Sequence, residues 1–135
     1  MGAAHPEAKI KFRKKTEKSL IGPSGEGAAA RFLEKNGYEI VEYNYRVCGS
    51  EVDLIAKKDE TLCFIEVKTR GSDDYGLPEE FVDKWKRRKI IRAAKVFIGQ
   101  KVYEDFYVRF DIISVLHKSG EVEINHIEHA FEGEG

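Results

Sequence analysis

The most constraining feature of the sequence is a pair of strand-like segments joined by a very short connection. Residues 52–57 and 62–68 are rich in β-branched and aromatic side chains, which favour strands. If Asp59 and Glu60 are the two loop residues of a hairpin, residues equally distant from them pair with each other. This register places Asp53 directly opposite Glu66, on the same face of the sheet.

The two faces of this predicted hairpin differ in chemistry. We expect the wholly apolar face to be buried, and it carries Val52, Leu54, Ala56, Cys63, Ile65 and Val67. The other face also carries charges, and its members are Glu51, Asp53, Ile55, Phe64, Glu66 and Lys68. Two adjacent carboxylates destabilise a strand pair unless a cation or a proton offsets their repulsion.

A divalent metal is one such offset. Mg²⁺ prefers oxygen ligands, and it takes only one or two protein carboxylates together with waters and substrate phosphate. Lys68 could then polarise an attacking water or stabilise the charge that develops on a phosphodiester. The alternative is a solvated strand face in which Glu51 pairs with Lys68.

Further predicted elements flank the hairpin. A helix over residues 25–36, with Ser24 as its N-cap and Gly37 at its end, precedes a strand over 38–47. A helix over 78–99 follows, and then a second hairpin over 106–116 and 121–127. This order predicts an α/β fold with a mixed central sheet of about five strands flanked by helices. We expect a basic, flexible arm over 1–23, one domain over 24–128 and a frayed acidic end over 129–135.

Charge is distributed unevenly along this nearly neutral chain. The formal net charge is −1, yet residues 84–101 hold eight basic side chains and no acidic one. A basic helix of this kind predicts contact with a nucleic-acid backbone, without sequence specificity. The residues assigned to DNA are Arg70, Lys84, Lys86, Arg87, Arg88, Arg92 and Lys95. A helix face that is merely solvated is the alternative.

Several other classes of protein are disfavoured. Cys48 and Cys63 show no CxxC spacing, which fits a reducing compartment better than a disulfide framework. No apolar run approaches the roughly 20 residues that cross a bilayer, and the first residues resemble no signal peptide. We therefore expect a cytoplasmic protein without membrane contact.

A few isolated side chains invite interpretation. Glu26 shares the inward stripe of the first helix, so it needs a partner or simply favours the helix N-terminus. Trp85 could stack on an unpaired base, although we expect it to anchor its helix to the sheet. We expect His126 and His129 to be solvated, and Arg109 to pair with Asp111 as a structural contact.

The two strands of the first hairpin also carry a family resemblance. The runs GSEVDLIA over 49–56 and FIEVKTR over 64–70, with matching residues from Gly25 to Val115, resemble the YraN family of small bacterial proteins. That family resembles the restriction-endonuclease-like, PD-(D/E)XK superfamily, especially the archaeal Holliday-junction resolvases. The resemblance implies that Asp53, Glu66 and the backbone carbonyl of Val67 bind Mg²⁺, or Mn²⁺ in its place. It also implies that Lys68 is the catalytic lysine and that Glu26 completes the site.

Three functions remain open at this point. The resemblance implies a metal-dependent endonuclease that cleaves DNA phosphodiesters, with a preference for branched DNA. A nucleic-acid-binding protein that keeps the fold without cutting is the second, and a protein-interaction module with a basic helix is the third. The sequence leaves open whether the active unit is a homodimer.

Overall fold

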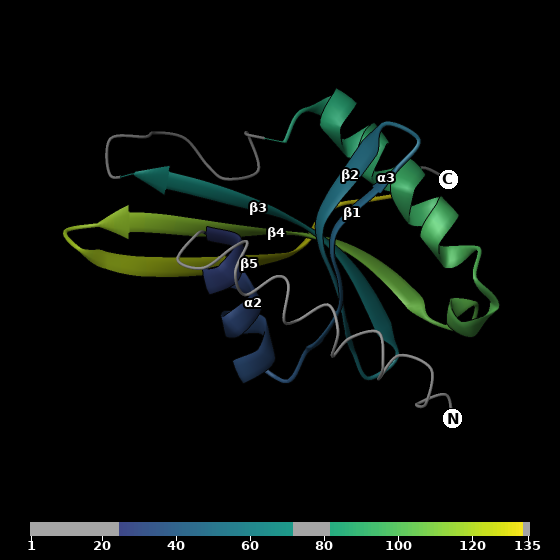
Figure 1. Cartoon of the computed structure of the whole chain (residues 1–135), viewed down its shortest axis with the longest axis horizontal. Coiled ribbons are helices and arrows are strands. Elements are labelled where there is room, and N and C mark those ends of the chain that lie inside the picture. Colours follow the sequence, from purple (N-terminus) through teal and green to yellow (C-terminus); the bar gives the residue numbers. More distant parts are fainter. Residues whose placement is uncertain (1–24, 72–81, 134–135) are drawn as a thin grey trace.

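The computed structural model describes residues 25–71 and 82–133, which form one mixed sheet with a helix on each side (Figure 1). The predicted α/β fold with five strands is confirmed. The elements in chain order are α2 (Gly25–Lys35), β1 (Glu39–Val47), β2 (Ser50–Lys58), β3 (Thr61–Gly71), α3 (Lys84–Ile98), the 3₁₀ helix η2 (Lys101–Tyr103), β4 (Tyr107–Lys118) and β5 (Glu121–Phe131).

Strand order in the sheet follows the chain, β1-β2-β3-β4-β5. Only β3 and β4 are parallel, because α3 crosses over between them, and every other neighbouring pair is antiparallel. No helix in the described ranges 25–71 and 82–133 is long and apolar enough to span a membrane.

Tight turns set the antiparallel registers. Cys48 and Gly49 both have positive φ, 50° and 76°, as a type I′ hairpin turn requires. Ser119 and Gly120 repeat this pattern between β4 and β5, at 51° and 78°. The β2–β3 turn at Asp59 and Glu60 gives the predicted register, from Lys58 opposite Thr61 to Leu54 opposite Ile65.

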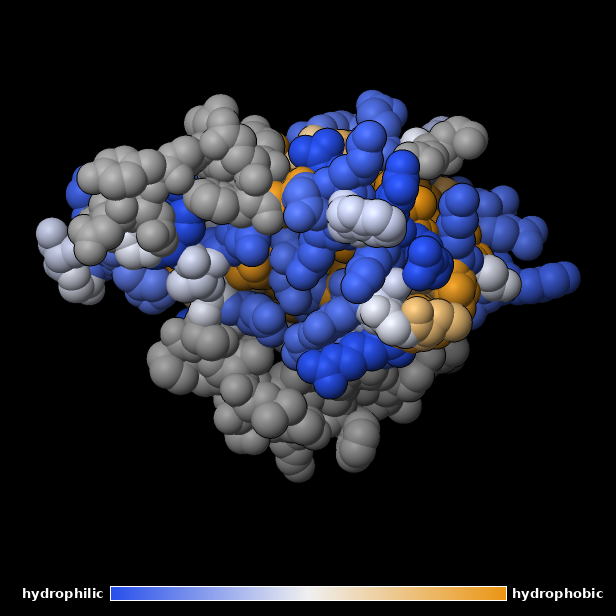
Figure 2. All heavy atoms as spheres, turned by 90° about the horizontal axis from the view of Figure 1, so that it is seen from above, coloured by the Kyte–Doolittle hydropathy of each residue, from blue (hydrophilic) through white to orange (hydrophobic). Residues whose placement is uncertain are grey.

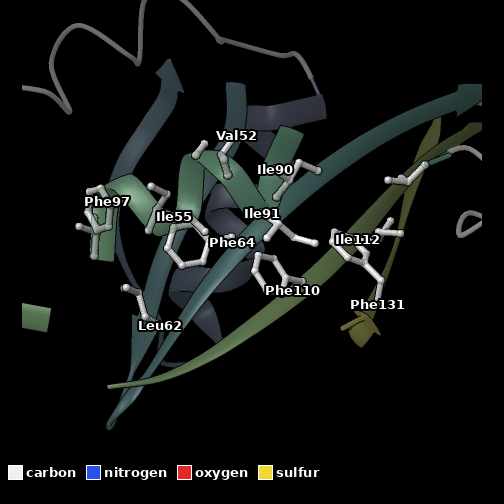
Figure 3. Close-up of a cluster of buried hydrophobic side chains, with 14 of the residues drawn as sticks. Val52, Ile55, Leu62, Phe64, Ile90, Ile91, Phe97, Phe110, Ile112 and Phe131 are labelled. Carbon is white, nitrogen blue, oxygen red and sulfur yellow. The ribbon is translucent and has the colours of Figure 1, made fainter. Parts of the chain in front are cut away.

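Each face of the sheet packs against one helix, which buries the central part of that face. On the α2 side, Ala29, Ala30 and Leu33 pack on strand residues that include Leu54 and Ile65. The α3 side holds a larger aromatic core, in which Phe64 contacts both Phe97 and Phe110 (Figure 3). Ile55 and Phe64 therefore lie in the core, although they share a predicted strand face with the charged residues.

One predicted face assignment is wrong. Val52 packs with Ile55 and Phe64 beneath α3, and it does not join Leu54 beneath α2. On the neighbouring strand, Asn44 adopts a left-handed φ of 45° between Tyr43 and Tyr45, which pack on opposite faces. Val52 pairs with Tyr45 and packs on the α3 side, whereas Leu54 pairs with Tyr43 and packs on the α2 side. Asp53 thus lies where the side-chain alternation of β2 breaks.

Some element boundaries also differ from prediction. Helix α3 begins at Lys84, because the side chain of Asp83 accepts a hydrogen bond from the Lys86 N–H and caps the helix there. Strand β5 continues to the buried Phe131, beyond the predicted end at 127 and into the segment expected to fray. The basic arm 1–23, the N-cap Ser24 and the predicted helix start at 78–81 lie outside the described residues.

Candidate active site

The candidate site lies at a fork between β2 and β3. Backbone pairing of the two strands ends at Leu54 and Ile65, so the next residues, Asp53 and Glu66, stand where the strands part. The Asp53 carboxylate spans this gap, because its Oδ2 accepts a hydrogen bond from the Val67 N–H at 2.8 Å. The predicted proximity of Asp53 to Glu66 is therefore achieved through a side chain, and the ladder does not extend to them.

Glu66 is the most buried acidic side chain of the site, with 3% of its surface exposed. Its Oε2 lies 3.3 Å from the Nζ of Lys86, on the first turn of α3. Its Oε1 is buried without any hydrogen-bond partner. A carboxylate oxygen that is buried without a hydrogen-bond partner carries a desolvation penalty, which a bound cation, a proton or a water would offset.

Burial and mutual repulsion raise the pKa values of the acids in this site. Burial raises the pKa of Glu66 to about 7, and the charge of Asp53 adds to the effect. Burial likewise raises the pKa of Asp53, against the lowering effect of the Val67 hydrogen bond. Burial lowers the pKa of Lys86, yet the neighbouring charges of Glu66 and Asp53 more than compensate and raise it overall. A positive charge is therefore stabilised at this site, because it offsets the repulsion between the acids.

Glu26 joins this group from the other side of the sheet. It lies in the first turn of α2, and Gly25 lets this turn approach β3 so closely that a Cβ there would collide with the Thr69 hydroxyl. Burial raises the pKa of Glu26 to about 7, with further contributions from the charges of Asp53 and Glu51. The side chain of Asn44 hydrogen-bonds Glu26 and acts in the opposite direction. The inward-facing acid predicted on this helix thus has its partners.

Lys68 and Glu51 do not form the pair that the solvated-face alternative requires. The two-residue turn at Cys48 and Gly49 places Glu51 opposite Arg46, and these side chains form an ion pair at 3.5 Å. Lys68 is half-buried, and its charge lowers the pKa of Glu66. The catalytic lysine implied by the resemblance therefore lies within electrostatic reach of the carboxylate pair.

The basic residues of α3 divide into groups with different contacts. Lys86 faces Glu66, and Arg87 donates to the Val82 carbonyl oxygen at 2.9 Å while lying over the Phe131 ring. The remaining predicted DNA contacts on this helix are exposed, namely Lys84, Arg88, Arg92 and Lys95. Figure 2 shows the face toward α3 as mainly hydrophilic, with smaller hydrophobic patches. Arg70 is half-buried near the end of β3.

The isolated side chains have mixed outcomes. Arg109 binds Asp111 through paired contacts, the shortest at 2.9 Å, which confirms the predicted structural pair. His126 is not solvated as expected, because it contacts Asp111 at 2.7 Å and its side chain is only 10% exposed. His129 is exposed. Trp85 does not anchor α3 to the sheet, since 69% of its surface is exposed.

Lys86 and Asn44 are the site residues that residue-by-residue reasoning missed. The sequence groups Lys86 with the cations predicted to contact DNA, because only the packing of α3 against the sheet shows that Lys86 contacts Glu66. Asn44 sits at a strand position where a left-handed residue interrupts the alternation. Its residue type, which tolerates that conformation better than most, was the available signal.

The donor set suits a hard cation that retains water. Within residues 25–71 and 82–133, no three His, Cys, Asp or Glu side chains are arranged to hold a metal ion. The two carboxylates that flank the fork nevertheless match Mg²⁺, which binds through one or two protein carboxylates and keeps several waters. The orphaned Glu66 Oε1 is the structural observation that fits such a ligand. The role of the Val67 carbonyl remains a prediction.

The fold and the site together define an α/β domain with a buried acidic centre at the fork of a mixed sheet. Residues 25–115 match the model of the Uncharacterised protein family UPF0102, and the chain belongs to this family, the YraN family of the sequence resemblance.

Relatives of the same family cover nearly the whole domain. A UPF0102 protein of Clostridium perfringens is 45% identical over 120 residues, which span 87% of this chain and 98% of the relative. A UPF0102 protein of Caldanaerobacter subterraneus is 41% identical over 87% of this chain and 99% of its own length. A third relative, from Prosthecochloris aestuarii, is 41% identical over 84% of this chain and 94% of its own length.

Proposed function

We propose that the chain is a metal-dependent endonuclease that hydrolyses DNA phosphodiester bonds, with branched or otherwise structured DNA preferred. The observation that carries this proposal is the pair of Asp53 and Glu66 at the fork, in which Glu66 is buried and one of its oxygens lacks a hydrogen-bond partner. A protein keeps two such carboxylates together against desolvation and repulsion where function needs them. The resemblance to resolvase-like nucleases supports the same activity.

The proposed cofactor is Mg²⁺, with Mn²⁺ as a substitute. Asp53, Glu66 and the Val67 carbonyl would hold it, because they supply the oxygen ligands that both ions accept. When bound, the ion would act as a Lewis acid toward a phosphodiester oxygen and would make a bound water more acidic.

The protein groups around this position supply the remaining chemistry. Lys68 offsets the negative charge that grows on the phosphate in the transition state. Glu26, with a pKa of about 7, can hold or release a proton near neutral pH. Lys86 neutralises Glu66 in the protein without a bound cation.

DNA is the proposed partner because α3 carries cations directly beside the acidic centre. Lys86, in the first turn of α3, reaches Glu66, while Lys84, Arg88 and Arg92 are exposed on the same helix. A backbone held along α3 would bring a phosphate toward the fork, without readout of base sequence.

The test is a cleavage assay on linear, nicked, flap and four-way-junction DNA, each with Mg²⁺, with Mn²⁺ and with EDTA. We expect cleavage with either metal, strongest on branched DNA, and none with EDTA. Asp53→Asn and Glu66→Gln should each abolish cleavage and Mg²⁺ binding by isothermal titration, while circular dichroism remains that of the parent.

Three results would change the interpretation. DNA affinity without cleavage in either metal would favour the non-catalytic nucleic-acid-binding protein. Absence of DNA affinity even at low salt would favour the protein-interaction module. Unchanged Mg²⁺ affinity in both carboxylate variants would overturn the site assignment itself.

A further inference from the structure

Trp85 is an exposed aromatic side chain that directly precedes Lys86, the residue of α3 that contacts Glu66. It is the only tryptophan in the chain, and it lies in the first turn of α3 with 69% of its surface exposed. Tryptophan is usually well buried, because its large apolar surface gains from leaving water. Its exposure here does not serve the helix–sheet core, which is built from other α3 residues such as Ile90 and Phe97.

The surroundings of this indole are cationic. The Arg88 guanidinium lies over the ring, 5.6 Å from its centroid, a distance at which the cation and the ring attract each other. Lys84 and Lys86 are its chain neighbours, and the Nζ of Lys86 is 3.3 Å from Glu66. A flat aromatic surface flanked by positive charge is the arrangement with which proteins bind single-stranded nucleic acid.

We propose that Trp85 is a stacking platform for an unpaired nucleobase. The preferred substrate class would then be DNA with unpaired or splayed bases beside the cleaved bond, such as flaps, junction branches and single strands. This inference rests on the proposed function, and it adds the feature by which the site distinguishes substrates. A base inside a continuous duplex cannot offer its face to the indole, because its neighbours already cover it.

Phosphate contacts alone would not give this discrimination. Lys84, Arg88 and Arg92 attract any nucleic-acid backbone, whether paired or not. Stacking on an aromatic side chain is tolerant of base identity but requires an accessible base face. Trp85 therefore adds selectivity for DNA structure on a helix that otherwise provides general affinity.

The single tryptophan makes the test direct, because all indole fluorescence comes from position 85. The full-length parent protein is titrated in EDTA, so that nothing is cleaved, with oligo-dT, a flap substrate and a blunt duplex of matched length. We expect quenching by oligo-dT and by the flap, and much weaker quenching by the duplex. Heparin provides charge without bases, and we expect it to bind with little quenching.

Affinity measurements on variants complete the test. Trp85→Ala should weaken binding of oligo-dT and flap DNA by about ten- to a hundredfold, and Trp85→Phe by much less. Duplex affinity should change by less than about threefold. Tyr107→Ala is the matched control, because Tyr107 is 72% exposed but pairs with Thr61 at the start of β3, five residues before Glu66.

The failures of the two proposals are distinguishable. If Trp85→Ala and Tyr107→Ala bind every DNA alike, or if heparin quenches as strongly as oligo-dT, Trp85 is no stacking platform while DNA binding stands. If the parent binds no DNA at low salt, both this inference and the proposed function are wrong.

Discussion

Two buried carboxylates on adjacent strands of this sheet differ in how their charge is compensated. Asp111 on β4 is fully buried, and Glu66 on β3 is 3% exposed. The two strands are parallel neighbours in which Asp111 pairs with Ile65 and Glu66 with Ile112. They are therefore close in the fold and similar in burial, but they lie in rows that face opposite sides of the sheet and have different partners.

Asp111 is saturated with hydrogen bonds. Arg109 contacts both of its oxygens, His126 contacts Oδ2 at 2.7 Å and the His129 N–H donates to Oδ1 at 3.2 Å. Arg109 in turn donates to the Tyr38 hydroxyl at 2.6 Å. Burial alone would raise the pKa of Asp111, but the bonds from His126 and Arg109 bring it below its ordinary value.

Glu66 has the reverse balance. One of its oxygens faces Lys86, the other has no partner, and Asp53 adds a like charge. Its pKa is raised where that of Asp111 is lowered. A satisfied carboxylate stabilises the fold, whereas an unsatisfied one beside a second acid marks a place where a ligand is expected.

The largest expected effect concerns the stability of the Asp111 centre. Asp111→Asn removes the charge that compensates Arg109, whose side chain is only 14% exposed. Breaking a buried ion pair from one side costs about 3–5 kcal/mol in the free energy of unfolding, measured by urea denaturation. Glu128→Gln is the matched control, because Glu128 contacts the same Arg109 at 3.8 Å but is exposed, and its loss should cost less than about 1 kcal/mol. Equal losses in the two variants would contradict the contrast.

The Glu66 centre should reveal itself in the pH dependence of stability. Because the pKa of Glu66 is about 7 in the folded protein and about 4.5 in an unfolded chain, the folded state holds the proton more tightly. This contribution to stability is complete below pH 4.5 and is lost as the pH rises through about 7. Its full size is about 3 kcal/mol, since one pKa unit corresponds to about 1.4 kcal/mol.

Comparison with Glu66→Gln isolates this effect. In EDTA the parent should lose stability relative to the variant between about pH 5 and pH 8, because glutamine does not ionise. Saturating Mg²⁺ should reduce the loss in the parent and leave the variant unaffected. Parallel pH profiles of the two proteins would show that Glu66 is compensated as fully as Asp111.

Next in size is the effect of Lys68 on chemistry. Its charge opposes one that grows only in the transition state, so Lys68→Ala should bind DNA almost normally and cleave it about a hundredfold more slowly. That factor corresponds to about 2.7 kcal/mol of barrier height. Lys57→Ala on the same hairpin, paired with Leu62 away from the fork, should cleave like the parent. Equal losses of binding and cleavage in Lys68→Ala would indicate a simple phosphate contact.

Only part of the site could be predicted from the sequence. The proximity of Asp53 and Glu66 could be predicted because the two turn residues determine the hairpin register, but the break in side-chain alternation at Asp53 could not. Trp85 and His126 could not be placed correctly, because their burial depends on the packing of α3 and on the β4–β5 register, which puts His126 opposite Ile113. Local patterns determine neighbours within a hairpin, whereas contacts between distant elements require the assembled fold.

Lys86 illustrates this limit within the site. On the sequence it is one of eight cations in a basic segment, and nothing local separates it from Lys84 or Arg88. In the fold it is the counter-ion of Glu66, while Arg87 is held by the Val82 carbonyl. Neutralising Lys86 and Arg87 would therefore disturb the acidic centre and the packing of α3, and it would not isolate DNA binding.

The smallest expected effect therefore concerns a cation of α3 that has neither role. Arg92 is exposed and lies one helical turn beyond Arg88. A plot of the logarithm of duplex affinity against the logarithm of salt concentration has a negative slope. If Arg92 contacts a phosphate, this slope should be about 0.9 less steep for Arg92→Gln than for the parent. Binding of unrelated sequences should weaken alike, by about fivefold to tenfold near 0.1 M salt, without change in Mg²⁺ affinity.

Lys58→Gln, at the end of β2 beside Gly37, is the matched control. If both variants keep the parent's salt slope, Arg92 only solvates α3, and the phosphate contacts must be sought elsewhere, first in the basic segment 9–18 of the sequence.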